Sequence, residues 1–164
     1  MKSKVLCDTD IISALAKAEA LDILELIFPK HEFLITEYVR DELDRSKQEG
    51  FDFPHKIFDF CKTITLNEDE LEIYESLEYV DISKTDLKNL IITKNRNMPL
   101  LTNDSKLYYK CEERDINVYD LRQILKAVFV DNLLSKNDLM EIVSKIEEKD
   151  NTTIKNKSDL FRRQ

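Results

Sequence analysis

Short apolar segments alternate with amphipathic helical segments along most of the chain, and this alternation constrains the fold more than any other feature. Strands that alternate with helices are typical of a parallel sheet with helices on both faces. Strands are predicted at 5–7, 33–35, 63–66, 100–102 and 116–119, and helices at 11–18, 21–28, 37–47, 56–60, 67–79, 83–97, 105–114, 120–131 and 135–149. The sequence therefore predicts an α/β fold with a central parallel sheet of about five strands.

The strand–helix pattern ends near residue 149, and the remaining residues are mostly polar. The chain has 164 residues, which fits one domain. We expect a single domain over 1–149 followed by a polar, mobile tail over 150–164. No apolar stretch is long enough to span a membrane, and no secretion signal is expected.

The glycine content excludes several classes of nucleotide-binding protein. The chain has one glycine, Gly50. A P-loop or a dinucleotide-binding fingerprint needs several glycines so that the backbone can approach phosphate. P-loop NTPases and dehydrogenases are therefore excluded. The net charge of −8 argues against a dedicated nucleic-acid-binding module, but less against a nuclease, because bound cations make acidic ligands attractive to anions.

The cysteines and histidines do not form a metal-binding or disulfide pattern. The three cysteines, Cys7, Cys61 and Cys111, are far apart, and no CxxC or HExxH motif is present. An odd number of scattered cysteines indicates reduced thiols in a cytoplasmic protein. A structural zinc site is not expected.

Two aspartates directly follow predicted strands. Asp8 follows the strand 5–7, and Asp104 follows the strand 100–102 after one intervening residue. Sites in parallel sheets form beyond the carboxyl ends of the strands, so both aspartates are expected at one edge of the sheet. The alternative is that each aspartate only caps the helix that follows it, because Asp is a preferred N-cap residue.

Two further acids are expected near the same edge. Glu42 falls within the apolar arc of its helix, which comprises Tyr38, Val39 and Leu43, so its carboxylate needs a metal or a buried basic partner. Asp86 is near the start of a helix that should begin beside Asp104. Its alternative role is in a capping box with Ser83.

Four carboxylates without histidine or cysteine suit hard cations such as Mg²⁺ or Mn²⁺. Such ions can activate water and stabilise the leaving oxygen during phosphodiester hydrolysis. Lysines beside the proposed acids could contact a nucleic acid, or could be ordinary solvated surface residues. They form two i,i+4 pairs, Lys84 with Lys88 and Lys106 with Lys110.

Five segments of the sequence together resemble the PIN-domain family. In order, they are VLCDTDII, TEYVRDEL, SKTDLKNL, PLLTNDSKL and INVYDL, and they span about residues 4–120. The resemblance implies a three-layer sandwich around a five-stranded parallel sheet, with Mg²⁺- or Mn²⁺-dependent cleavage of single-stranded RNA. It also implies metal-site roles for four acids and a supporting role for Thr102; the acids are Asp8, Glu42, Asp86 and Asp104.

The sequence departs from the family pattern at three positions. Asp10 stands where Asn or Ser is usual, so it could add charge to the site or cap the helix. Asn89 and Leu90 stand where small residues are more usual.

Many prokaryotic members of the PIN-domain family are toxins that pair with an antitoxin and often dimerise. We expect such a contact at the apolar stretch 127–130, for which ordinary core packing is the alternative.

Two other functions remain open. Asp8 and Asp10 after a strand also resemble the nucleophile and acid of a haloacid-dehalogenase-like phosphatase, although the glycine-bearing acidic motif of those enzymes is absent. The other alternative is a PIN-like scaffold that binds a partner without cleaving RNA. Metal binding would distinguish such a scaffold from a nuclease.

Overall fold

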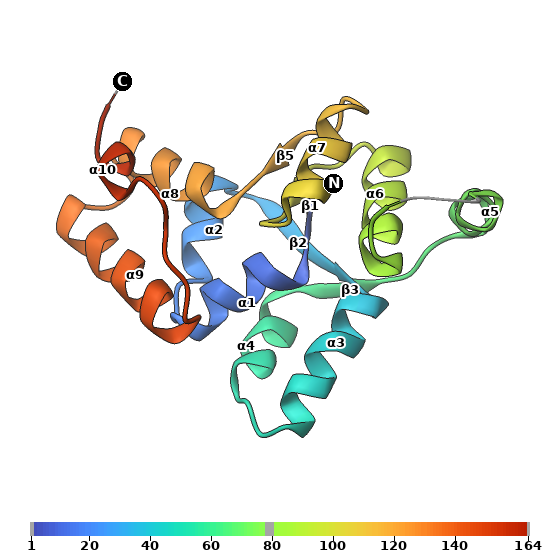
Figure 1. Cartoon of the computed structure of the whole chain (residues 1–164), viewed down its shortest axis with the longest axis horizontal. Helices are drawn as coiled ribbons and strands as arrows, with labels where there is room; N and C mark the ends of the chain where they lie inside the picture. Colours follow the sequence, from blue (N-terminus) through green and yellow to red (C-terminus); the bar gives the residue numbers. More distant parts are fainter. Residues whose placement is uncertain (1, 78–80, 164) are drawn as a thin grey trace.

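A computed structural model describes residues 2–77 and 81–163. Its centre is a parallel sheet of five strands in the order β3-β2-β1-β4-β5 (Figure 1). The strands are β1 (Ser3–Cys7), β2 (His31–Thr36), β3 (Lys62–Ile64), β4 (Leu100–Leu101) and β5 (Val118–Tyr119). The predicted α/β fold with five parallel strands is confirmed.

Strand β1 occupies the middle of the sheet because it is apolar on both faces. Leu6 pairs with Leu34 of β2 on one side and with Leu100 of β4 on the other. Val5, Leu6 and Cys7 are all fully buried. Continuous apolar runs of this kind are typical of parallel strands covered on both faces.

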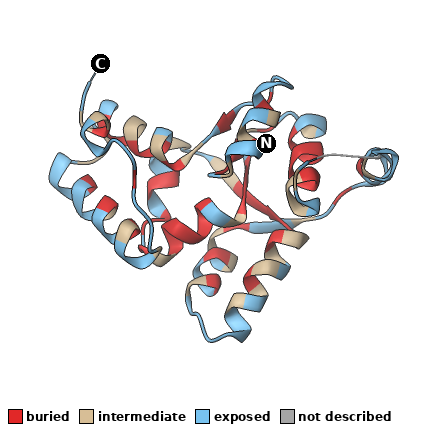
Figure 2. Cartoon of the chain, in the orientation of Figure 1, coloured by how far each residue is buried: buried red, intermediate tan, exposed pale blue. Residues whose placement is uncertain are grey.

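One face of the sheet carries the larger apolar cluster, which includes Val5, Cys7 and Ile35. Helices α1 (Thr9–Lys17), α2 (Asp22–Ile27), α3 (Glu37–Gln48), α4 (Phe53–Phe60), α8 (Leu121–Val130) and α9 (Lys136–Lys149) contribute to it. Ile12, Leu15 and Leu125 lie at its centre without exposed surface. Figure 2 shows the buried residues concentrated on the inner sides of these helices.

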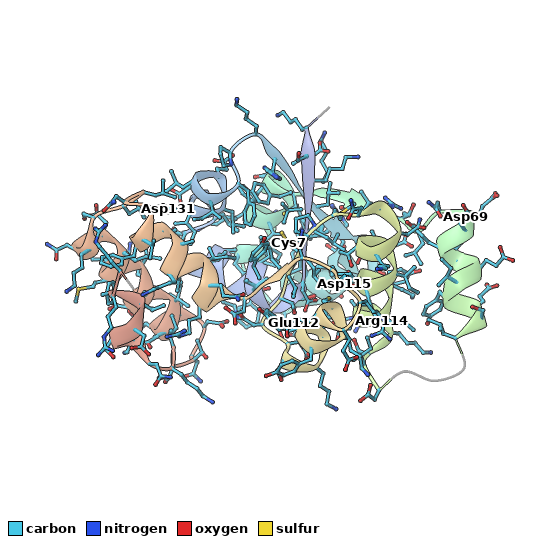
Figure 3. All side chains as sticks on the ribbon, turned by 90° about the horizontal axis from the view of Figure 1, so that it is seen from above. Cys7, Asp69, Glu112, Arg114, Asp115 and Asp131 are labelled. Atoms are coloured by element: carbon cyan, nitrogen blue, oxygen red, sulfur yellow. The ribbon has the colours of Figure 1, made fainter. Side chains whose placement is uncertain are left out.

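The opposite face is covered mainly by α6 (Lys84–Arg96) and α7 (Ser105–Glu112), which pack on Leu6, Leu34 and Leu100. Helix α5 (Glu68–Ser76) contacts α6 at the outer end of the molecule. Figure 3 shows Cys7 near the middle of the molecule, whereas Asp69 on α5 lies at one end. The sheet is therefore the middle layer of three.

Most predicted helix starts are confirmed by side-chain caps. Thr36, Ser83 and Ser135 accept a hydrogen bond from the third helical N–H, and Asn67 and Glu70 form a complete capping box. Helix α4 begins at Phe53 rather than at the predicted residue 56, because Pro54 fits the first turn of a helix. The predicted end of the next helix at Tyr79 lies outside the described residues, and α5 ends at Ser76.

Residues 150–163 pack against the domain, which the predicted boundary at 149 and the prediction of a mobile tail did not anticipate. Ile154 and Leu160 are buried in the larger cluster, and α10 (Lys157–Leu160) contacts α8. The segment contains few apolar residues, but each packs into the domain. Packing against the core therefore continues well beyond residue 149.

The apolar stretch 127–130 is covered mostly by the chain itself. Val128 is fully buried, and Phe129 is buried against Phe161 with ring centroids 5.6 Å apart. Only Val130 remains substantially exposed, at 39%. The alternative of core packing therefore accounts for most of the stretch, and the association surface expected there is reduced to a small patch.

Two further sequence expectations can be compared with the described chain. Cys7, Cys61 and Cys111 are free and buried, in agreement with the prediction of reduced thiols. Across residues 2–77 and 81–163, no helix combines the length and apolar character needed to cross a bilayer.

Candidate acidic active site

Asp8 lies at the carboxyl end of β1 and is only 4% exposed. Its Oδ1 accepts hydrogen bonds from the Thr9 N–H at 2.8 Å and from Asn89 Nδ2 at 3.3 Å. Its Oδ2 accepts a hydrogen bond from the Thr102 hydroxyl at 2.8 Å. Asp8 therefore caps α1, as predicted by the alternative interpretation, and also contacts polar side chains from two other elements.

The Thr102 hydroxyl connects Asp8 to Asp104. Thr102 is fully buried directly after β4, and its Oγ1 accepts a hydrogen bond from the Asp104 N–H at 3.1 Å. Asp104 is the N-cap residue of α7, and its Oδ1 accepts from the Leu107 N–H at 2.8 Å. Since β1 and β4 are adjacent, both acids lie at the same sheet edge, as predicted.

Glu42 projects from the second turn of α3 toward the same region. Its Oε2 accepts a hydrogen bond from the Thr9 hydroxyl, and its Oε1 accepts one from the Thr85 hydroxyl at 3.1 Å. No ion pair within the described residues includes Glu42. The sequence left open a buried basic partner for Glu42. In the structure its carboxylate instead accepts hydrogen bonds from two neutral hydroxyl groups.

Asp86 is the third residue of α6, next to Thr85. Its N–H donates to Ser83 Oγ at 3.0 Å, so the predicted cap at Ser83 is present. Its carboxylate is close enough to Asp8 and Asp104 for their charges to act on it. Ser83 therefore caps the helix, and the carboxylate of Asp86 is also close to the other acids.

Known structures of the same architecture have been solved. VapBC-1 from nontypeable Haemophilus influenzae is 17% identical over 71% of this chain and 97% of the matched chain, with a TM-score of 0.57. PAE2754 from Pyrobaculum aerophilum is 14% identical over 88% of this chain and 99% of the matched chain, with a TM-score of 0.52. Both are PIN-domain structures. This chain has a PIN-domain fold.

The similarity extends to the fold but not to the sequence as a whole. No protein-family model matches the chain, and no curated protein matches it significantly. The PIN fold explains how the four acids come together, since β1, α3, α6 and α7 each bring one acid to the carboxyl edge of the sheet. The PIN-like three-layer fold predicted from the sequence is confirmed.

The acids of this PIN fold perturb one another, and among the described residues none of the four forms an ion pair with a basic side chain. Burial, followed by the charge of Asp86, raises the pKa of Asp8 from 3.8 to about 7. Burial also raises the pKa of Asp86, and the charges of Asp104 and Glu42 act in the same direction. Perturbed carboxylates that meet at one edge are typical of functional sites.

Asp10 extends this acidic cluster toward the C-terminal part of the chain. Partial burial of its carboxylate raises its pKa, and the nearby charges of Asp104, Glu42 and Asp150 add to the effect. Asp150 also pairs with Lys17, with Nζ and Oδ1 2.8 Å apart. Asp10 therefore adds charge to the site, which is one of the two roles predicted for it.

The donor set fits a hard divalent cation in its chemistry. Carboxylate oxygens are the ligands that Mg²⁺ and Mn²⁺ prefer, and Asp8 has a strongly raised pKa without a paired cation. As they stand, no three acidic, histidine or cysteine side chains among the described residues are placed to hold a metal ion. The described acids therefore supply the type of ligand that such a cation prefers, but not a preformed coordination site.

Sequence reasoning missed the polar side chains that orient the acids. Thr102 was predicted as a supporting residue, but Thr9 and Thr85 were not. Asn89 was noted only as a departure from the family pattern. It is fully buried and donates to Asp8, whereas its Oδ1 has no hydrogen-bond partner. Only the tertiary structure reveals these contacts, because each joins residues from different elements.

The lysines expected to contact a nucleic acid have different surroundings. Lys106 is exposed at the start of α7, whereas Lys110 pairs with Asp81 at 3.3 Å. Lys84 is exposed, but Lys88 is buried against the ring of Tyr38, with Nζ 3.1 Å from the ring centroid. Lys84 and Lys106 are therefore freer than their i,i+4 partners to meet a substrate.

The comparisons favour a PIN fold over a phosphatase of the haloacid-dehalogenase type, because the two matching structures reported above are PIN-domain structures.

Proposed function

We propose that this chain is a metal-dependent endoribonuclease that hydrolyses phosphodiester bonds of single-stranded RNA. The observation that carries the proposal is the cluster of four carboxylates at one edge of a PIN fold, in which none pairs with a basic side chain of the described residues. Mutual repulsion among such acids is relieved when a divalent cation binds. The likeness to PIN-domain structures supports a nuclease rather than another metal-binding function.

Asp8, Glu42, Asp86 and Asp104 are the residues that would hold Mg²⁺ or Mn²⁺. A divalent cation at this edge would supply Lewis acidity toward a phosphodiester oxygen and would favour ionisation of water. Thr102 orients Asp8 through its hydroxyl, and Thr9 and Thr85 orient Glu42. Asp8 carries a proton through much of the range below about pH 7 in the metal-free protein, so metal binding there must displace that proton.

We further propose that the chain is the toxin of a toxin–antitoxin pair and acts in the cytoplasm. The support is the structural likeness to VapBC-1, a PIN-domain toxin–antitoxin complex, together with the sequence resemblance to the family. The partner would be an antitoxin protein. A homodimer is the other association that the resemblance implies.

The first test is incubation of the purified chain with labelled single-stranded RNA, with Mn²⁺ and with excess chelator. We expect cleavage with Mn²⁺ and none with chelator. Cleavage that persists in chelator and in the Asp8→Asn, Asp104→Asn double variant would overturn the mechanism. Failure to bind Mn²⁺, together with no cleavage of any RNA, would favour the non-catalytic scaffold.

The second test separates helix capping from metal binding at Asp104. Asn caps a helix about as well as Asp, so Asp104→Asn should preserve α7. We expect the variant to lose activity by about 100-fold or more, together with most of the rise in melting temperature that Mn²⁺ gives the unmodified chain. Asp22→Asn, which removes one charge from the first turn of α2, serves as the control. If Asp104→Asn keeps both properties, Asp104 is only a cap.

A further inference from the structure

A pocket of about 180 Å³ with a mixed polar and apolar lining lies between Asn103, which precedes Asp104, and the C-terminal segment. Asn103, which stands between Thr102 and Asp104, forms part of one wall, and the start of α8 continues that wall. The opposite wall comes from the chain after α9, which returns alongside α8 in Figure 1. This wall comprises Asp150, Thr152, Thr153, Ile154 and Lys155.

The C-terminal wall is held in place by contacts at both ends. At one end, Asp150 pairs with Lys17 of α1 at 2.8 Å. At the other, Arg122 Nε of α8 donates to the Lys155 carbonyl at 3.2 Å. Ile154 between them is buried, and its N–H donates to Glu147 at 2.8 Å. These contacts hold residues 150–155 in a fixed position against α1 and α8.

Several of the groups that line this pocket can donate hydrogen bonds. Asn103 Oδ1 already accepts from the Leu121 N–H at 2.9 Å, which leaves the amide nitrogen to donate. Lys155 forms no ion pair within the described part of the chain. The acids that line the pocket are engaged, because Asp120 caps α8 and Asp150 pairs with Lys17.

An ammonium, an amide and threonine hydroxyls are the groups that bind phosphate oxygens and ribose hydroxyls. We propose that the pocket is a subsite for the phosphate and ribose of a nucleotide next to the cleaved bond in single-stranded RNA. This proposal rests on the function proposed above. In this subsite Lys155 contacts the phosphate, and Thr153 contacts the ribose or the phosphate. Because Asn103 is next to Asp104, a nucleotide bound here places its neighbouring phosphodiester bond beside the acids.

The test compares Lys155→Ala with Lys145→Ala in the full chain. Lys145 is an exposed lysine outside this pocket, so both variants lose the same charge. We expect Lys155→Ala to raise the KM for RNA about tenfold with kcat unchanged, because it removes a contact made equally in the ground and transition states. The slope of log affinity against log salt, measured in chelator, should fall by about 0.7 for Lys155→Ala. Thr153→Val, which removes only a hydroxyl, should raise KM about threefold.

If the two lysine variants change KM and the salt slope equally, Lys155 acts only through the overall charge of the protein, and the proposed subsite is overturned. Unchanged KM and salt slope in Lys155→Ala would overturn it directly. If the chain binds RNA with the expected Lys155 dependence but does not cleave it, the subsite stands and the proposed nuclease activity fails. If the chain does not bind RNA at all, both proposals fail.

Discussion

Two buried carboxylates, Glu70 on α5 and Asp8 after β1, have opposite surroundings. Glu70 has no exposed surface, and its oxygens accept hydrogen bonds from Arg96 at 2.8 Å and from Asn95 at 3.0 Å. Asp8 is almost as buried, but it accepts hydrogen bonds only from uncharged groups. Glu70 has a basic partner, whereas Asp8 forms no ion pair within residues 2–77 and 81–163.

The difference appears in the pKa values of the two groups. Burial tends to raise the pKa of Glu70, but hydrogen bonds from Arg96, Asn67 and Asn95 outweigh it and hold the value at about 2. Burial and the Asp86 charge raise the pKa of Asp8 to about 7. Burial alone therefore does not decide the direction of the pKa shift of these two acids. The hydrogen bonds from a cationic partner decide it for Glu70.

The largest expected change in stability comes from removal of Arg96, the cationic partner of Glu70. Arg96→Gln leaves a buried carboxylate without its charged partner, which should lower the free energy of unfolding by about 3 kcal/mol. Arg114→Gln is the control, because Arg114 pairs with Glu113 in a more exposed setting worth about 0–1 kcal/mol. Urea unfolding of both variants is the measurement. Equal decreases in the free energy of unfolding would show that the buried Glu70–Arg96 pair stabilises the fold no more than the exposed Glu113–Arg114 pair.

A smaller effect concerns the pH dependence of stability without metal. The pKa of Asp8 is raised from 3.8 to about 7 in the folded state, so the destabilisation caused by its ionisation is fully present above about pH 7 and is relieved as the pH falls below 7. Stability should therefore rise between pH 8 and pH 5, with most of the rise below pH 7. The pKa of Glu70 is lowered, so its contribution is present above about 4.5 and is lost as the pH falls toward 2.

Asp8→Asn tests the origin of the rise between pH 8 and pH 5. At pH 8 the metal-free variant should be more stable than the unmodified chain by about 1–2 kcal/mol, because the buried charge is absent. Its stability should also change less over that pH range. Thermal unfolding in chelator at several pH values gives both quantities. A rise of the same size in Asp8→Asn would assign it to other groups.

The smallest expected effect concerns two lysines near the acids. Lys106 is exposed and forms no ion pair within the described chain, whereas Lys110 pairs with Asp81, much as Arg96 pairs with Glu70. Lys106→Ala should lower the salt slope of RNA binding by about 0.7, and Lys110→Ala should lower it less. Fluorescence anisotropy with labelled RNA in chelator measures both slopes. The reverse order would show that substrate breaks the Lys110 pair.

The parts of the fold predicted from the sequence are those that depend on local pattern. The apolar strand before Asp8 and the helices that begin near residues 37 and 67 were predicted, since each depends on neighbouring residues. Residues 150–163 were predicted less well. Their core contacts depend on a few apolar side chains, such as Leu160, that are spread through a polar segment.

The candidate site was predicted in part for a similar reason. The topology of a parallel sheet brings Asp8 and Asp104 together, and this followed from their positions after two strands. The hydroxyl contacts of Glu42 join residues 33 and 43 positions apart in the sequence, and no local pattern indicates them. The helix that contains Glu70 was predicted, but the contact of Glu70 with Arg96 was not.

The order of the strands has a consequence for the synthesis of the chain. Strand β1 is made first, yet it pairs with β4 across more than ninety residues, and the wall behind its acids closes only when Asp150 reaches Lys17. A nascent chain on the ribosome therefore contains Asp8 long before it contains the rest of the site. A chain that is released before β4, or a nicked product that ends there, would lack Asp104 and therefore the complete set of four acids. The topology thus delays assembly of the acidic site until β4 and the segment around Asp150 have been synthesised.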